Sequence, residues 1–131
     1  MKSEKRSKKT VGPSMIRQGD VLLMRVTKVD GEIEDAPKDA RGIVLAEGET
    51  SGHFHAVFGK SGRGEIKLMR FKDARAERLL VVGDGEGATV RVVGGGAGGV
   101  DRHTPIEVGP GTFKVRIQRA WDSSSARQVQ D

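Results

Sequence analysis

Apolar and polar residues alternate in several short runs along the chain. The clearest run, at 112–119, puts Phe113, Val115 and Ile117 on one face of an extended strand and polar side chains on the other. The remaining runs are rich in aliphatic and β-branched residues, and turns that contain glycine separate them. The pattern predicts seven or eight short strands, over 20–29, 42–46, 53–58, 65–71, 79–82, 88–93, 105–108 and 112–119.

Helical periodicity is almost missing from the sequence. Only 72–78 (KDARAER) has a helical composition, and it predicts no more than a single turn. The acidic stretch 32–41, which contains proline, is predicted as a loop or a short irregular crossing. Short strands with glycine-rich turns and little helix are typical of an all-β barrel or sandwich. A chain of 131 residues has room for one such domain.

Most of the net positive charge of the chain lies in its N-terminal segment. Residues 1–14 hold five lysines and arginines against one glutamate, although the whole chain carries a net charge of only +5. We expect 1–14 to be a disordered basic arm, 15–121 a single β domain and 122–131 a frayed polar tail. Translation can begin at Met1 or at Met15, and the sequence leaves that choice open.

The basic arm predicts only weak, salt-sensitive affinity for nucleic acid, because the rest of the chain is nearly neutral. Four phenylalanines, one tryptophan and no tyrosine offer little material for stacking on single-stranded bases. The chain has no cysteine, which excludes disulfides and thiolate zinc sites and favours a reducing compartment. No apolar run approaches the roughly 20 residues of a membrane span. We expect a cytoplasmic protein.

Two histidines flank a phenylalanine in the strand predicted at 53–58. Strand alternation puts Phe54, Ala56 and Phe58 on one face, which we expect to be the core face. His53 and His55 then share the other face, about 7 Å apart at a rise of ~3.3 Å per residue. Such a pair can converge on one metal ion or one anionic group; the alternative interpretation is a solvated polar face.

The third histidine, His103, completes a candidate pocket. Imidazoles bind zinc and similar divalent metals, so His53, His55 and His103 are candidate metal ligands. Glu47 and Glu49 precede the pair closely enough to add a carboxylate oxygen. The same three histidines are candidate acids and bases, because imidazole titrates near neutral pH.

Basic residues near the histidines in sequence, or in the last strand, are candidates for binding an anion. Arg102 stands beside His103, and Lys114 and Arg116 form a row on the polar face of the last strand. The glycine runs 83–87 and 94–99 do not form a phosphate cradle, because strands rather than a helix follow them. Asp20 and the two glutamates match no recognisable catalytic spacing.

Several short motifs occur in a fixed order along residues 15–121. They are QGDVLL at 18–23, LAEGE at 45–49 with GHFH at 52–55, HTPI at 103–106, and PGTF at 110–113 leading to QR at 118–119. This order resembles a family of small uncharacterised proteins of phages and bacteria. The resemblance implies that the motifs and histidines belong together, and it implies no activity. Relatives often carry a further histidine where this chain has Val100.

Two classes of function follow from the sequence. In the first, the three-histidine pocket binds a small anionic, nucleotide-like ligand or a divalent metal such as zinc, and turnover of the ligand is left open. In the second, the chain is a non-enzymatic phage protein, either a virion or assembly component or an inhibitor of a host protein. The basic arm and strand edges would then make the contacts, with other proteins or with further copies of this chain.

Overall fold

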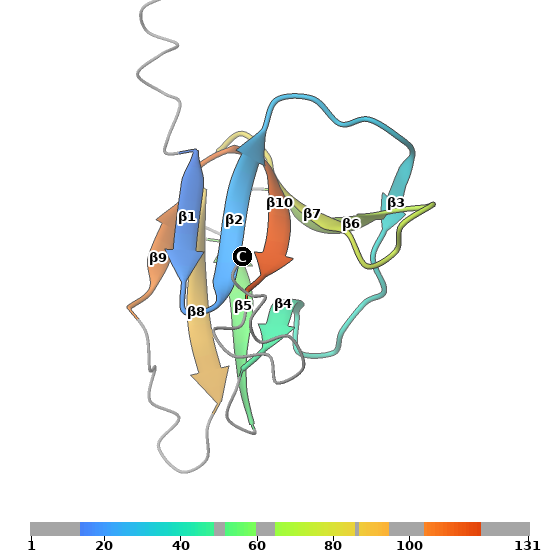
Figure 1. The fold of residues 1–131 in the computed structure, drawn as a ribbon. Coiled ribbons are helices and arrows are strands. Elements are labelled where there is room, and N and C mark those ends of the chain that lie inside the picture. Colours follow the sequence, from blue (N-terminus) through green and yellow to red (C-terminus); the bar gives the residue numbers. More distant parts are fainter. Residues whose placement is uncertain (1–13, 49–51, 60–64, 86, 95–103, 119–131) are drawn as a thin grey trace, which may run out of the picture.

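The computed structural model describes residues 14–48, 52–59, 65–85, 87–94 and 104–118, which form ten strands in two antiparallel sheets (Figure 1). The predicted polar tail, and the predicted basic arm apart from Ser14, lie outside the described residues. The described residues include no helix that is long and apolar enough to cross a membrane.

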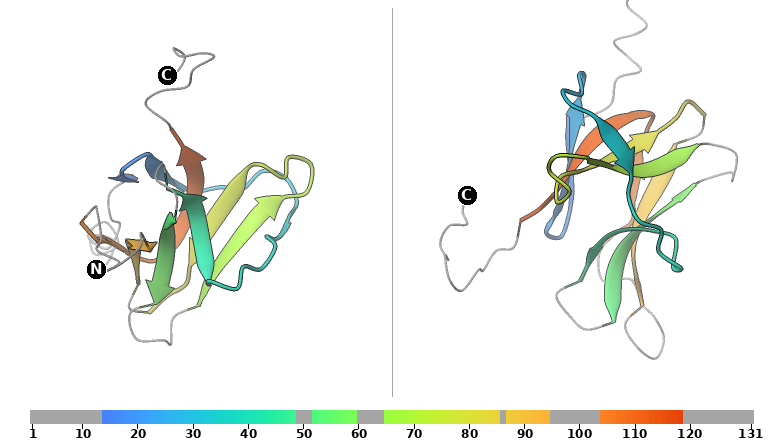
Figure 2. Two further views of the ribbon diagram at one scale, coloured as in Figure 1. Left: turned by 90° about the horizontal axis from the view of Figure 1, so that it is seen from below. Right: turned by 90° about the vertical axis from the view of Figure 1, so that its right-hand side faces the viewer.

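The larger sheet has six strands in the order β1-β2-β10-β7-β6-β3. Its strands are Met15–Gln18 (β1), Val21–Val26 (β2), Ile33–Asp35 (β3), Ile66–Phe71 (β6), Arg78–Val82 (β7) and Gly111–Ile117 (β10). The smaller sheet has the order β4-β5-β8-β9. Its strands are Ile43–Glu47 (β4), His53–Gly59 (β5), Ala88–Gly94 (β8) and Ile106–Val108 (β9). In the left view of Figure 2, β6 and β1 lie on opposite sides of the molecule.

The predicted all-β class is confirmed, and the structure adds two strands to the eight predicted ranges. β1 is four residues long and turns only two side chains, Ile16 and Gln18, toward the interior. A strand this short gives no recognisable alternation of apolar and polar residues. β3 lies inside 32–41, which we expected to be a loop, and pairs with β6 through Ile33↔Phe71 to Asp35↔Met69. The helical turn predicted at 72–78 is wrong, since this segment is a non-helical turn whose last residue opens β7.

The core lies between the inner faces of the two sheets. Phe113 and Val115 are buried there, which confirms the predicted apolar face of the last strand. The larger sheet contributes Ile16, Val21, Leu23, Leu80, Val82, Phe113 and Val115 to the core cluster. The smaller sheet contributes Leu45, Val57, Ala88, Val90 and Val108. Because each sheet alone has one apolar face to cover, the two faces bury each other.

The predicted core face of β5 is wrong. Ala56 is buried as predicted. Phe58, however, is 43% exposed and Phe54 is only partly buried, whereas Val57 on the opposite face is 5% exposed. Val57 pairs with Val90 of β8, and both belong to the core cluster. Both faces of β5 carry apolar residues, so alternation alone could not choose between them; the register with β8 made the choice. Both histidines of β5 therefore point inward.

We expect Val57→Ala to lower the free energy of unfolding by about 2 kcal/mol, because it removes two buried methyl groups and leaves a cavity. Phe58→Ala, which truncates a larger but partly exposed side chain, should cost under ~1 kcal/mol. Urea unfolding of both variants measures the difference. A larger loss in Phe58→Ala than in Val57→Ala would contradict the observed orientation of β5.

Candidate functional site

A tight turn between β1 and β2 builds the first half of the site. Gln18 pairs with Val21, so Gly19 and Asp20 make a two-residue connection. Gly19 has φ of 59°, in the left-handed region that glycine enters without steric cost. The turn places the side chains of Gln18 and Asp20 on either side of His55 from β5.

Gln18 is a buried polar residue, 5% exposed, that joins three separate segments. Its Nε2 donates to the carbonyl oxygens of Val90 (2.9 Å) and Thr104 (3.0 Å). These two acceptors fix the orientation of the amide, so that Oε1 faces the Nδ1 of His55 at 2.9 Å. All the hydrogen-bonding groups of this amide are thereby engaged.

The amide of Gln18 also sets the tautomer of His55. Oε1 can only accept, so Nδ1 of His55 carries the hydrogen and donates it. The other ring nitrogen, Nε2, lies 3.6 Å from Oδ1 of Asp20. The side chains of His55 and Asp20 are only 3% and 9% exposed. A neutral imidazole would direct the Nε2 lone pair into the same buried space as a carboxylate.

That geometry favours a positive charge between the two groups. A proton on Nε2 would create a buried imidazolium–carboxylate pair. A divalent metal bound by Nε2 and a carboxylate oxygen is the alternative, and zinc ligands at tetrahedral angles lie about 3.4 Å apart given usual Zn–N and Zn–O lengths. The observed 3.6 Å between Nε2 and Oδ1 is close to that spacing. A metal-binding histidine usually donates its other ring N–H to an oxygen acceptor, and Nδ1 of His55 donates to the amide oxygen of Gln18.

His53 lies on the same face of β5, is 7% exposed, and has a buried Nδ1 that finds no hydrogen-bond partner among the described residues. A Cβ on Gly48 would lie 2.9 Å from the Cβ of His53, so glycine is required for this close approach. An unsatisfied buried ring nitrogen costs about 1–3 kcal/mol. It offers an unused polar atom to a ligand.

Three predicted site residues, Glu49, Arg102 and His103, lie outside the described residues. Thr104, the next residue after His103, has its carbonyl oxygen bound by Gln18. Within the described part of the chain, no group of three histidine, aspartate or glutamate residues could hold a metal ion. The convergence of all three histidines stays a prediction.

Glu47 lies on the opposite face of the smaller sheet from the histidines. It pairs across the strands with Phe54, and its Oε2 accepts from Nη2 of Arg41 at 2.6 Å. The same guanidinium binds Asp39 at 3.0 Å and stacks over the Phe54 ring at 4.5 Å. Hydrogen bonds from Arg41 lower the pKa of Glu47 and lower that of Asp39 to about 2. Arg41 thus engages the carboxylate that we expected beside the histidines.

Lys114 and Arg116 lie on the outer face of the larger sheet. They alternate along β10 with Phe113 and Val115, which point into the core. Lys114 forms an ion pair with Glu77 at 3.7 Å, and Arg116 is exposed. The structure therefore does not bring this basic row together with the histidines.

The sequence reasoning missed two residues of the site, Gln18 and Asp20. Asp20 was set aside because it matched no catalytic spacing, and Gln18 was noted only within the QGDVLL motif. A usable signal was present, since two polar residues flank a glycine immediately before the most apolar strand. A turn at that glycine would aim both side chains at one neighbour.

Comparison with known families gives one match, to a family described as a domain of unknown function (DUF8820), over residues 17–118. The matched range contains Gln18, Asp20 and all three histidines. No curated protein and no solved structure matches the chain.

We expect Gln18→Leu to lower the free energy of unfolding by about 2–4 kcal/mol, because it leaves two carbonyl oxygens and the Nδ1–H of His55 buried without partners. Arg17→Met is the matched control: Arg17 is exposed, and its bond to Gln118 should contribute about 0.5 kcal/mol or less. Urea unfolding compares them, and equal losses would show that the Gln18 contacts are dispensable.

Arg41→Gln should return the pKa of Asp39 from about 2 toward its usual value of 3.8. A lowered pKa means that the pairing with Arg41 stabilises the fold above the usual pKa and is lost as the pH falls through the lower value. Carboxyl carbon shifts followed by NMR during an acid titration measure this change. An unchanged titration of Asp39 in the variant would remove Arg41 as its cause.

Proposed function

The chain belongs to the DUF8820 family, whose function is unknown, and we propose that it is a metal-binding protein that holds a divalent ion such as zinc. The ligands are Nε2 of His55, a carboxylate oxygen of Asp20 and an imidazole nitrogen of His103. The observation that carries the proposal is the 3.6 Å distance between Nε2 of His55 and Oδ1 of Asp20, both deeply buried.

The hydrogen bond from His55 to Gln18 supports a metal role for this histidine. A ligand imidazole binds through one nitrogen while the other nitrogen donates to an oxygen, which holds the ring at a fixed angle. Gln18 provides that oxygen, and its own amide is held by two backbone carbonyls. The ring of His55 is therefore oriented before any ion arrives, which lowers the cost of binding.

His103 is the third ligand in this proposal on two grounds. It is the remaining histidine of the chain, and the carbonyl of its neighbour Thr104 binds the same Gln18 amide that orients His55. Two imidazoles and a carboxylate form a usual zinc set that leaves a fourth position for water or an anionic ligand. His53, with an unused Nδ1, is placed on the same strand face to interact with such a ligand.

We expect the purified chain to bind one zinc ion per molecule after removal of metal with a chelator and titration with zinc chloride. Asp20→Asn should weaken zinc binding at least tenfold, because the neutral amide is a poorer ligand than the carboxylate. Calorimetric titration measures the affinity, and thermal unfolding with and without zinc measures the stabilisation that binding must produce.

Asp39→Asn is the matched control, since it removes a carboxylate that is bound to Arg41 on the loop before β4. It should leave zinc affinity within about twofold of the parent chain. A purely structural polar network predicts a different result: Asp20→Asn would change stability equally with and without zinc. Absence of zinc-dependent stabilisation in the parent chain would overturn the proposal.

A further inference from the structure

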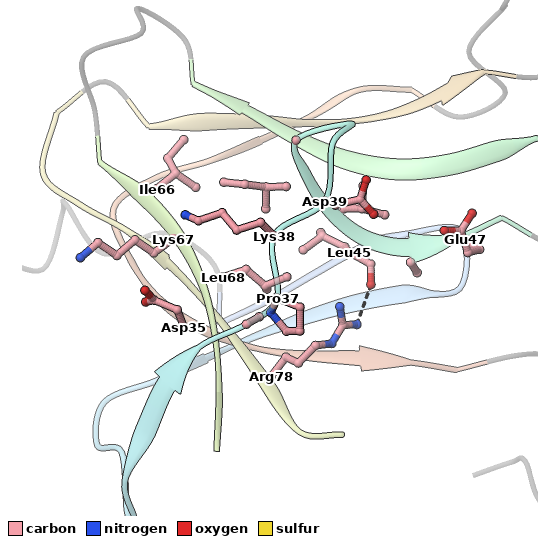
Figure 3. A pocket seen from close by; sticks show the side chains of 15 residues that line it. Asp35, Pro37, Lys38, Asp39, Leu45, Glu47, Ile66, Lys67, Leu68 and Arg78 are labelled. Atoms are coloured by element: carbon pink, nitrogen blue, oxygen red, sulfur yellow. Dashed lines mark hydrogen bonds between the residues drawn. The ribbon is translucent and has the colours of Figure 1, made fainter. Parts of the chain in front are cut away.

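An open groove of about 570 Å³ lies where β4 faces β6 and β7, on residues other than those of the histidine site. Leu45, Ile66 and Leu68 give it an apolar lining, and Lys38 and Lys67 stand among its other residues (Figure 3). Its volume is within the usual range for small-molecule sites.

Arg78 is a partly buried charged residue of the groove. It opens β7 and donates from Nη2 to the carbonyl oxygen of Leu45 at 2.5 Å. Figure 3 shows the guanidinium reaching toward that carbonyl, with Leu68 and Pro37 nearby. Burial lowers the pKa of Arg78, although arginine remains charged at neutral pH.

No carboxylate among the described residues forms an ion pair with Arg78. The two other arginines of this region are paired: Arg70, directly opposite in the β6–β7 register, binds Glu34 at 2.6 Å, and Arg41 binds Asp39 and Glu47. A guanidinium has five N–H donors, and the Leu45 carbonyl uses one of them. Arg78 is thus a partly desolvated cation whose counter-ion is not supplied by the described part of the chain.

The carbonyl that holds Arg78 comes from an irregularity in β4. The register of β4 with β5 shifts between Val44 and Ala46, so Leu45 is the extra residue of a bulge. Its side chain is fully buried in the core while its carbonyl is left for Arg78 rather than for a ladder bond. The bulge therefore fixes the guanidinium at one place in the groove.

We propose that this groove binds a small organic oxyanion, a carboxylate or a phosphate ester, whose charged oxygens contact Arg78 and whose apolar part packs on Ile66 and Leu68. A planar guanidinium matches two oxygens of either group, and the low local polarity strengthens the contact. Lys38 and Lys67 stand at the groove together with three carboxylates, of which Asp39 and Glu47 are paired with Arg41 and Asp35 is exposed. The proposal is independent of metal at Asp20 and His55.

The test uses the full chain and three probes, phenyl phosphate, benzoate and uncharged benzyl alcohol, followed by NMR of backbone amides and of the arginine Nε–H groups. We expect saturable shifts at Arg78 and Leu45 with at least one anion at millimolar concentration, and none with benzyl alcohol. Stronger binding of phenyl phosphate identifies a phosphate ester as the ligand type, and stronger binding of benzoate identifies a carboxylate.

Arg78→Gln should weaken binding of the preferred anion at least tenfold, whereas Arg116→Gln, an exposed arginine on the outer face of β10, should leave it within twofold. Arg78→Lys keeps a cation if the glutamine variant fails to fold, and it should weaken binding at least threefold through loss of two-point contact. Absence of saturable shifts, equal binding of benzyl alcohol, or unchanged affinity in the folded Arg78 variants would overturn the proposal.

Discussion

The side-chain amide of Gln18 satisfies polar groups from three parts of the smaller sheet: Val90 of β8, Thr104 before β9 and His55 of β5. It does so from β1, at one edge of the other sheet. A buried polar group without a partner raises the free energy of the folded state. The two sheets therefore pack closely at this point only when all of these hydrogen bonds form. These bonds set the tautomer of His55, and the hairpin turn at Gly19 places Asp20 on the other side of the same ring.

The two faces of the smaller sheet carry different polar groups, buried histidines on one and exposed ion pairs on the other. Inward, His53 and His55 lie in the core with their ring nitrogens largely removed from water. Outward, Arg41 binds two carboxylates and covers an aromatic ring, where water screens the charges and each pair contributes little to stability. A carboxylate on the outer face, such as Glu47, cannot complete a site on the inner face, however near it is in sequence.

The partners of the arginines also depend on the surroundings of each side chain. Arg41 and Arg70 have carboxylate partners, whereas Arg78 meets a backbone carbonyl at the bulge of β4. The sequence does not show which arginine has a carboxylate partner, because that depends on the neighbouring strand that each side chain contacts in the fold. The groove and the histidine site are both products of the way β4 and β5 approach the larger sheet, yet they use separate residues.

The sequence by itself determined the all-β class, most of the strands and the apolar face of the last strand, predicted at 112–119, because these depend on local alternation and turn residues. Only the tertiary structure decided which face of β5 is buried and which residues meet His55. Val57 and Phe58 are equally acceptable core residues until β8 sets the register. Gln18 and Asp20 meet His55 across 37 and 35 positions; the local signal at Gly19 indicates a turn that brings the two side chains together, but it does not identify their neighbour.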